Sequence, residues 1–431
     1  MNKTVLVWFT NNQRVEDNRV LEAAIKTGHQ VIGVYCFNKR VYELNQFGFK
    51  KIDRFRAKFI QKSITDLKTA LKQKNITLFT FYDLPENCIP SICEEFNIKD
   101  IYIQQEWTFE ELSEFEIVNA ALTDVTFIEV YDQFLFHPDD VPMAFSEVAE
   151  VFTVFRKICE KKSKVRSTID IPVLGASNFV DVETKIPSLE DLGFKAFEQP
   201  AHSAFPLEGG ENAAKKRLEH YFFKTKKLGF YKKTRNGLIG VDYSSKFSPW
   251  LANGSISARY IYEKVKLFEK EHYKNQSTYW MIFELIWRDY FKFISLKHGT
   301  KLFLRDGFKE RKYEWQMNHK AISQWINGET AEPFVNANMI ELKETGWMSN
   351  RGRQNVASYF AKTMKQDWRI GAAYFESLLL DYDVHSNYGN WQYVAGVGND
   401  PRDRVFNVKN QAERYDPNGK FQRTWLQKEL F

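Results

Sequence analysis

The sequence predicts a Rossmann-like α/β domain with a parallel sheet, followed by an all-α domain, and a long linker joins the two. Three observations predict this. Short strand and helix patterns alternate over the first 130 residues, periodicity is lost between residues 131 and 210, and helical patterns follow from residue 211. A chain of 431 residues is also too long for one ordinary core. The expected boundaries are therefore 1–130, 131–210 and 211–431.

Short β-branched or aromatic runs predict five strands, at residues 4–9, 30–37, 76–81, 100–104 and 125–130. Helical patterns between them lie at 18–27, 49–74, 86–96 and 108–122. Parallel sheets of this kind bind ligands at the carboxyl ends of their strands. The first strand continues into residues 10–14 without G-x-G-x-x-G, and no P-loop occurs. An ordinary NAD enzyme is therefore disfavoured.

The segment 131–210 holds half of the chain's 12 prolines and no sustained periodicity, which predicts a connector draped over the surface. In the helical region, Ser277 can cap a helix from 278 to about 297, which Gly299 would end. The strand and helix patterns elsewhere show no internal repeat.

Charge divides the chain. The net charge of +6 combines −6 over residues 1–200 with +12 over 201–431, and the window 101–150 has twelve acids and no Lys or Arg. A basic second half suggests a polyanion partner, although lysines that simply solubilise a helical domain explain the charge as well. Nine of the eleven tryptophans follow residue 249, which calls for a packing or stacking reason.

Location and redox state follow from what the sequence lacks. No window approaches 18 consecutive apolar residues and no signal or transit segment begins the chain, so we expect a cytoplasmic protein without a membrane span. The four cysteines, Cys36, Cys88, Cys93 and Cys159, form no C-x-x-C and are interpreted as reduced thiols. No ligand pair has metal-binding spacing, so we expect no metal.

One face of the predicted helix 278–297 is unusual. It carries two indoles, a phenyl ring, a carboxylate and a guanidinium, at Trp280, Phe291, Trp287, Glu284 and Arg288. Burying Glu or Arg unpaired costs several kcal/mol, roughly. The face is either a half-buried surface with an intrahelical Glu284–Arg288 pair, or the aromatic wall of a ligand cavity.

Three further motifs are polar. The turn Ser244, Ser245, Lys246, Phe247, Ser248 offers hydroxyls and an ammonium to a phosphate, although serine clusters usually only cap turns. Residues 350–354 add two guanidiniums, and residues 381–393 combine two carboxylates, amides and aromatics in a mixture too polar for a core.

In these motifs the chain resembles the cryptochrome/photolyase family, and most closely its DASH branch. The resemblance spans residues 4–426 and is strongest where 231–237, 244–248, 283–289, 350–354 and 381–393 recur in order. At the N-terminus Thr10 replaces an Arg of the family pattern. The family implies an α/β antenna domain, residues 1–130, and an all-helical domain, 211–431, that binds non-covalent FAD and DNA.

The resemblance assigns roles residue by residue. Flavin contacts are implied for Tyr231, Ser244, Ser245, Lys246, Phe247, Ser248, Arg288, Asn350, Arg353, Asp381, Asp383 and Asn387, with an Arg353–Asp381 pair beside the flavin and Asn387 facing its N5. Lesion and DNA contacts are implied for Glu284, Trp287, Trp347, Tyr393, Arg235 and Gln411, with Lys232 and Lys233 on the DNA face. Trp391, Trp368 and Trp315 match the electron-relay tryptophans, whereas Trp325 and Trp425 are expected only to pack.

The function so implied is light-driven, FAD-dependent repair of cyclobutane pyrimidine dimers by a monomeric carbon–carbon lyase, with single-stranded DNA preferred. Trp391, Trp368, Trp315, Asn387 and Glu284 would take part in the chemistry. The antenna expected is 5,10-methenyltetrahydrofolate, with Glu106 in its pocket. The rival hypotheses are a blue-light signalling cryptochrome without efficient repair, and a nucleic-acid-binding flavoprotein whose photochemistry is incidental.

Overall fold

A five-stranded parallel sheet forms the first part of the computed structural model, which describes residues 3–427. The strand order is β3-β2-β1-β4-β5, and every neighbouring pair is parallel. The strands are β1 (Thr4–Trp8), β2 (Gln30–Cys36), β3 (Thr77–Phe81), β4 (Asp100–Gln104) and β5 (Thr126–Val130). All five predicted strands are therefore confirmed to within two residues at either end.

Helices cover both faces of the sheet, because alternate residues of each buried strand point to opposite sides. Val5 and Val7 of β1 pack with α1 (Arg19–Ile25) and α2 (Arg54–Lys72). Leu6 and Trp8 pack on the other side with α3 (Pro85–Glu95) and α4 (Phe109–Ala120). Strands β2 and β3 lie on one side of β1, and β4 and β5 lie on its other side. The topological switch point of the sheet is therefore at the carboxyl ends of β1 and β4.

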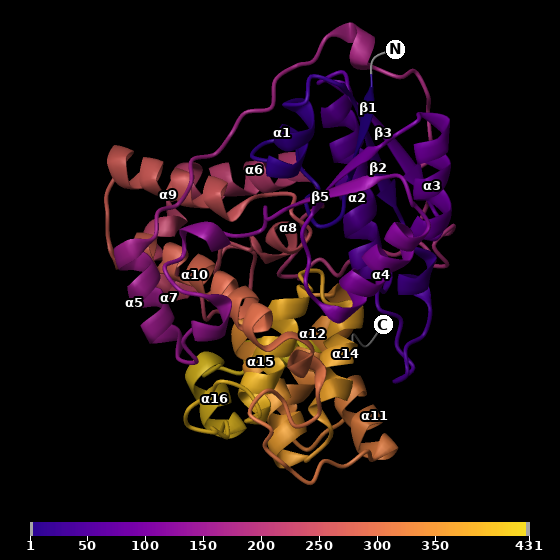
Figure 1. The fold of residues 1–431 in the computed structure, drawn as a ribbon. Coiled ribbons are helices and arrows are strands. Elements are labelled where there is room, and N and C mark those ends of the chain that lie inside the picture. The colour runs from indigo at the N-terminus through magenta and orange to yellow at the C-terminus, as the bar shows by residue number, and fades with distance from the viewer. Residues whose placement is uncertain (1–2, 428–431) are drawn as a thin grey trace.

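The segment between the two domains contains more structure than its sequence predicts. It forms α5 (Phe152–Lys162), whose Phe152 and Phe155 pack into the helical core. The prediction of a connector without secondary structure is therefore wrong over α5. Beyond α5 the chain passes the N-terminus and continues around the sheet domain (Figure 1). Ile171 and Leu192 are buried against the sheet domain, whereas Phe205 is buried in the helical core.

The rest of the chain is helical, as predicted. The helices are α6 (Glu211–Glu219), α7 (Tyr231–Thr234), α8 (Ser248–Ala252), α9 (Ala258–Glu271), α10 (Gln276–His298), α11 (His319–Asn327), α12 (Pro333–Thr345), α13 (Asn350–Ser358), α14 (Trp368–Leu378), α15 (Val384–Ala395), α16 (Val408–Tyr415) and α17 (Lys420–Leu426).

The central helix, α10, corrects one prediction. Its cap is Asn275 and not Ser277: the Asn275 side chain accepts hydrogen bonds from the backbone N–H groups of Ser277 (2.7 Å) and Thr278 (3.1 Å). The Thr278 hydroxyl in return accepts from the Asn275 backbone N–H at 3.2 Å. This reciprocal arrangement satisfies more free donors than a serine two residues later could. Gly299 ends the helix as predicted.

A buried ion network joins the two domains. Arg259 of α9 donates to Asp17 at 2.9 Å and to Asp132 at 2.6 Å, and Arg14 also pairs with Asp132. The Ser257 hydroxyl adds a hydrogen bond to Asp17 at 2.6 Å. All four charged side chains are at most 4% exposed, so each charge depends on its partners.

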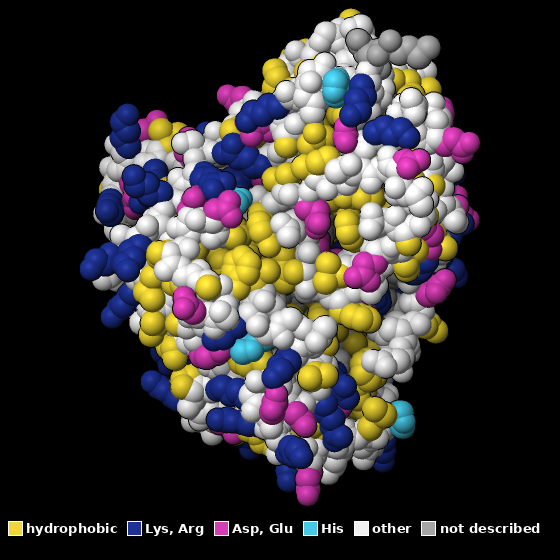
Figure 2. Space-filling view, in the orientation of Figure 1, with side chains coloured by type: hydrophobic (Ala, Val, Ile, Leu, Met, Phe, Trp, Pro, Cys, Tyr) yellow, Lys and Arg dark blue, Asp and Glu magenta, His cyan; other side chains and the backbone are white. Residues whose placement is uncertain are grey.

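Lys and Arg side chains gather over the helical part of the face drawn in Figure 2, in keeping with the +12 charge of residues 201–431. All four cysteines are free thiols. Within residues 3–427, no helix has the length and apolar character needed to cross a membrane.

Candidate functional site

A cleft of about 570 Å³ in the helical domain brings together most of the residues singled out from the sequence. Its lining includes Tyr231, Ser244, Ser245, Lys246, Phe247, Ser248, Arg288, Asn350, Arg353, Asp381, Asp383, Arg235, Glu284, Trp287, Trp347 and Tyr393. Asn387 and Trp391 line a smaller cavity of about 90 Å³ that shares Asn350, Arg353, Asp381 and Asp383 with the cleft. Gln411 lies at the rim, where it accepts a hydrogen bond from Arg351 at 3.3 Å.

Arg353 and Asp381 form the ion pair that the family resemblance implies. One guanidinium nitrogen of Arg353 donates to both carboxylate oxygens of Asp381 at 2.9 Å, and its Nε donates to the Met348 carbonyl at 3.0 Å. The Asp381 carboxylate is only 4% exposed. This pair fixes a charged carboxylate in the wall that both cavities share.

Lys246 is a buried cation without a hydrogen-bond partner among residues 3–427. Its Nζ lies 3.4 Å from the centre of the Tyr243 ring and 4.3 Å from that of Trp347, and its backbone has a φ of +64°. Lysine rarely adopts that conformation. Burial lowers the pKa of Lys246, and the negative charge of the nearby Glu341 partly offsets this decrease. A phosphate in the cleft would supply the missing anionic partner.

A second carboxylate, Asp383, begins α15 and accepts a hydrogen bond from the backbone N–H of Ser386 at 2.8 Å. Its other oxygen pairs with Lys292 at 3.0 Å. Burial alone would raise the pKa of Asp383, but the charges of Lys292 and Arg288 hold it well below its usual range. Asp383 is therefore a fixed anion that can accept hydrogen bonds from a ligand hydroxyl or N–H.

The amide of Asn387 has only one possible orientation. Its Nδ2 donates to the carbonyl of Ala372 at 3.1 Å, and a carbonyl can only accept. The Oδ1 atom is therefore the one left to the ligand cavity that Asn387 lines. An amide oxygen there can accept a hydrogen bond from a ligand N–H.

The mouth of the cleft combines aromatic and charged side chains. Glu284 pairs with Arg235 at 2.6 Å, so the alternative pair between Glu284 and Arg288 is not formed. Arg288 instead donates to the backbone carbonyls of Leu251 and Gln133. Burial raises the pKa of Glu284, and Arg235 opposes that rise.

Trp287 is held flat at this mouth. Its ring stacks on Phe152 of α5 with a centroid distance of 3.7 Å and an interplanar angle of 12°. Lys232 lies 4.3 Å above the ring of Trp280, about two turns earlier in the same helix as Trp287. Flat aromatic rings beside cations suit the stacking of bases and the pairing of phosphates.

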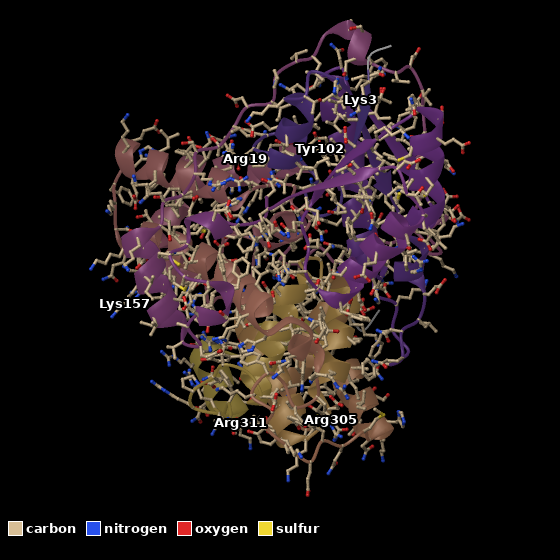
Figure 3. All side chains as sticks on the ribbon, viewed as in Figure 1. Lys3, Arg19, Tyr102, Lys157, Arg305 and Arg311 are labelled. Carbon is tan, nitrogen blue, oxygen red and sulfur yellow. The ribbon has the colours of Figure 1, made fainter. Side chains whose placement is uncertain are left out.

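The three candidate relay tryptophans are buried, and one of them, Trp391, lines the small cavity. Trp391 is 2% exposed, and its ring packs directly on Gly371. A Cβ atom at position 371 would lie only 2.3 Å from the Trp391 ring, so a larger residue would not fit there. Trp368 stands one helical turn before Gly371 and donates its Nε1 to the carbonyl of Arg305 at 2.9 Å. Arg305 also donates to the Trp315 carbonyl at 3.0 Å, and it lies at the outer surface of the helical domain (Figure 3).

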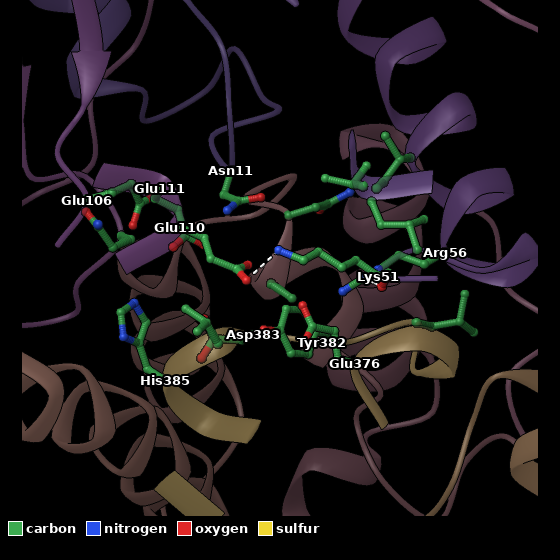
Figure 4. A pocket seen from close by; sticks show the side chains of 18 of the residues that line it. Asn11, Lys51, Arg56, Glu106, Glu110, Glu111, Glu376, Tyr382, Asp383 and His385 are labelled. Atoms are coloured by element: carbon green, nitrogen blue, oxygen red, sulfur yellow. Dashed lines mark hydrogen bonds and ion pairs between the residues drawn. The ribbon is translucent and has the colours of Figure 1, made fainter. Parts of the chain in front are cut away.

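A separate cavity of about 200 Å³ lies between the domains, beside the switch point of the sheet. Asn11 follows β1, while Gln104 and Glu106 stand at and after the end of β4. Figure 4 shows Glu106 and His385 at one end of this cavity and Arg56 with Glu376 at the other. Burial raises the pKa of Glu106 to about 7, and the Oε1 of Gln104 is buried without a partner among the described residues.

His385 lines the interdomain cavity and contacts a buried serine hydroxyl. The Ser295 hydroxyl contacts the Lys292 carbonyl at 2.8 Å, the Trp107 Nε1 at 2.7 Å and the His385 Nδ1 at 2.7 Å. The indole can only donate to the hydroxyl oxygen, whereas the hydroxyl hydrogen can go either to the Lys292 carbonyl or to the His385 Nδ1. Burial lowers the pKa of His385 well below its usual value, so the ring is neutral and one of its two nitrogens is an acceptor.

Several acidic residues in or near the two cavities were not predicted from the sequence. Glu341 of α12 is fully buried near Lys246, and burial raises its pKa to about 8. The interdomain cavity also contains Glu110, Glu111 and Glu376. The acid-rich window 101–150 was the only available signal for the first two, and nothing local marks Glu341 or Glu376. Among residues 3–427, no group of His, Cys, Asp and Glu side chains could hold a metal ion.

Comparison with known proteins agrees with this geometry. A family model described as DNA photolyase matches residues 5–173, and one described as the FAD binding domain of DNA photolyase matches 280–429. Cryptochrome DASH of Gloeobacter violaceus is 44% identical over 428 residues, which cover 98% of this chain and 85% of that protein.

Two solved structures extend the comparison. The Synechocystis sp. cryptochrome has a TM-score of 0.93 at 42% identity and covers 98% of this chain and 88% of its own. An archaeal photolyase from Sulfolobus tokodaii, solved with two FAD molecules, has a TM-score of 0.78 at 25% identity, with 98% and 90% coverage.

Proposed function

This chain belongs to the DASH branch of the cryptochrome/photolyase family and carries its FAD-binding domain, and from that premise we propose that it repairs cyclobutane pyrimidine dimers in a light-driven reaction. The observation that carries the proposal is the continuity of one cleft. Anion-binding and hydrogen-bonding groups lie at its inner end, and Trp287, Glu284 and Arg235 lie at its mouth. A lesion can therefore approach a flavin within the same space.

The inner residues fit a flavin dinucleotide. Lys246 and the hydroxyls of Ser244, Ser245 and Ser248 would hold the diphosphate, with Tyr231 and Phe247 beside them, because the Lys246 Nζ has no hydrogen-bond partner among the described residues. Arg353 and Asp381 would contact the ring, together with Asn350 and Arg288. Asp383 would accept from a ribityl or ring donor, and the free Oδ1 of Asn387 would accept from N5–H.

Reduced FAD, when bound and excited by light, supplies the electron that splits the dimer. The protein's own residues bind and orient. Trp287, Trp347 and Tyr393 would stack against the dimer bases, and Glu284, kept in place by Arg235, would hydrogen-bond to them. Arg235 and Gln411 would face the phosphates. Flipping a dimer out of a duplex costs about a few kcal/mol that a single strand does not require, so we infer a preference for single strands.

Trp391, Trp368 and Trp315 are proposed to reduce the oxidised flavin from the surface. The indole N–H groups of Trp391 and Trp315 have no hydrogen-bond partner among the described residues, whereas that of Trp368 donates to the carbonyl of Arg305. Each indole is buried, with exposures of 2%, 0% and 9% respectively, so each is shielded from bulk water.

The interdomain cavity is proposed to hold an antenna pigment of the folate type, methenyltetrahydrofolate. The Glu106 carboxylate and the Gln104 Oε1 can both accept hydrogen bonds. The pyrimidine edge of a folate carries two adjacent donors, the 2-amino group and N3–H, whereas the imide edge of a flavin carries one donor between two carbonyls. Two acceptors favour the folate edge. The second FAD named for the Sulfolobus relative would meet repulsion here.

The proposed function is tested with reduced protein and one dimer placed in single-stranded, looped and fully paired DNA at fixed salt. Repair should be fastest on the single strand, by tenfold or more if only ~1.4 kcal/mol of the flipping cost is unrecovered. Fastest repair of the paired duplex would contradict the single-strand assignment. No repair of any substrate by flavin-loaded, reduced protein would contradict the proposed function and favour the photoreceptor hypothesis.

A further inference from the structure

An open groove lies next to the flavin cleft, and of its lining residues only Lys233 has been given a role so far, on the DNA face. We call it the side groove; its lining includes Phe230, Lys233, Asn236, Ile239, Arg414 and Tyr415. Tyr243 belongs to both the side groove and the cleft, so a single side chain separates them. Anything that leaves the cleft past Tyr243 enters the side groove.

Two large apolar side chains are exposed in the side groove. Phe230 is 53% exposed and Ile239 is 43% exposed. Phe230 ends a short 3₁₀ turn just before α7. Ile239 stands between Leu238, which is buried, and Gly240, whose φ of +85° turns the chain. An exposed apolar residue alone needs no explanation, but two in one groove with a charged rim are typical of a binding surface.

The charges at the rim are mainly positive. Lys233 and Arg414 are exposed. The one carboxylate of the side groove, Asp242, is occupied by Arg217 at 2.6 Å and Lys227 at 2.8 Å, with His220 at 3.3 Å. Asp242 therefore leaves little negative charge to repel an anion, and the two exposed cations remain available to one.

The rim between the two spaces is rigid. Arg351, which lines the cleft, lies 4.5 Å from the centre of the Tyr415 ring and donates to Asn236 at 3.4 Å and to Gln354 at 2.9 Å. These contacts connect α13, α16 and the turn after α7. The path from the cleft to the side groove thus passes over guanidinium and aromatic surface.

We propose that the side groove binds the single-stranded DNA segment adjoining the lesion, with one or two unpaired bases packed on Phe230 and Ile239 and phosphates paired with Lys233 and Arg414. This inference rests on the proposed function for the identity of the strand. Apolar surface with cations is the chemistry of sequence-tolerant single-strand binding. Bases in a duplex are already stacked and paired, so the groove adds affinity only for unpaired flanks.

The test is the dependence of affinity on flank length. Reduced protein is titrated with a thymine-dimer dinucleotide and with oligonucleotides that extend the dimer by two, four or six thymidines on either side. Loss of one base–aromatic contact of ~1–3 kcal/mol lowers affinity roughly 5- to 150-fold. Phe230→Ala should therefore weaken binding of the extended single strands about tenfold and leave binding of the dinucleotide, which cannot reach the groove, unchanged.

A matched control is available. Phe109 of α4 is 62% exposed on the sheet domain, and Phe109→Ala should change neither affinity. Ile239→Ser and Lys233→Gln probe the same groove, so the test survives if Phe230→Ala fails to fold. Equal affinity of wild type and Phe230→Ala for the long strands, or an equal loss for the dinucleotide, would overturn the proposal.

The two proposals fail in different ways. If no variant repairs the dinucleotide but Phe230→Ala still weakens binding of long single strands, the proposed repair function is wrong and the side groove stands. If the dinucleotide is repaired and flank length has no effect on affinity in wild type, the side groove proposal is wrong and repair stands.

Discussion

Replacing Arg353 by alanine should lower the affinity for FAD about a hundredfold. The variant leaves the Asp381 carboxylate, 4% exposed, without the guanidinium that now bonds both of its oxygens at 2.9 Å. Breaking a buried ion pair costs ~3–5 kcal/mol. Arg353 itself is 24% exposed, so the lower end, about 3 kcal/mol, is the appropriate value, and that corresponds to roughly two decades of affinity.

Two further variants separate charge from shape. Asp381→Asn keeps the volume and leaves Arg353 unpaired, but the guanidinium can reach water and the loss should be smaller, ~1 kcal/mol. Arg353→Lys keeps the positive charge without the two-oxygen geometry and should give an intermediate affinity. The double variant should cost less than the sum of the single ones, because the residues act as one unit.

The assay is quenching of FAD fluorescence on titration with apoprotein, with thermal unfolding of the same apoproteins measured separately. The second measurement matters because part of the cost can appear as lost stability of the fold rather than as lost affinity. Unchanged affinity for FAD in both Arg353→Ala and Asp381→Asn would refute the reasoning and place the flavin elsewhere.

Three further predictions concern the relay, the interdomain cavity and the domain junction. Trp391→Phe should strongly slow photoreduction of oxidised flavin with an external donor while Trp325→Phe does not, as followed by absorbance under blue light; equal rates in all three proteins would exclude this route. Glu106 has a pKa of about 7 in the folded protein against 4.5 in the unfolded chain, so its contribution to stability is full below pH 4.5 and is lost as pH rises through about 7. Thermal unfolding from pH 5 to 8 should therefore show a smaller loss of stability in Glu106→Gln than in the wild type. Identical stability profiles of the two proteins would contradict this prediction. Asp132→Ala should destabilise the fold by ~3–5 kcal/mol in denaturant unfolding, because Arg14 and Arg259 lose a shared buried partner; a change under 1 kcal/mol, roughly, would show that the junction tolerates the loss.

The sequence predicted best those elements and motifs that consist of residues close together in the chain. Strands of a parallel sheet and the four polar motifs are readable because each is a short run with its own periodicity or composition. The carboxylate of Asp381 could be paired with Arg353 only through the family resemblance, since 28 residues separate them.

Contacts between distant segments lay outside such reasoning. Helical spacing offered Arg288 as a partner for Glu284, but the fold supplies Arg235 from α7. The helix α5 was not predicted, because its packing depends on distant residues. Phe152 of α5 stacks on Trp287, and no neighbouring residue in the sequence indicates this contact. Asn275 was overlooked as a cap because Ser277 is an equally good cap residue, and only the path of the backbone decides between them.

The two proposed chromophore sites share more than a boundary. Asp383 and Arg288 line both the flavin cleft and the interdomain cavity. Lys292 pairs with Asp383 at 3.0 Å and also faces Glu106, whose pKa it lowers against the larger effect of burial. A ligand that donates hydrogen bonds to Glu106 would favour the ionised form of Glu106. The negative charge of Glu106 would then attract the Lys292 ammonium, which also pairs with Asp383. A ligand in the interdomain cavity should therefore change the electrostatic field at the proposed flavin site, even if it transfers no light energy to the flavin.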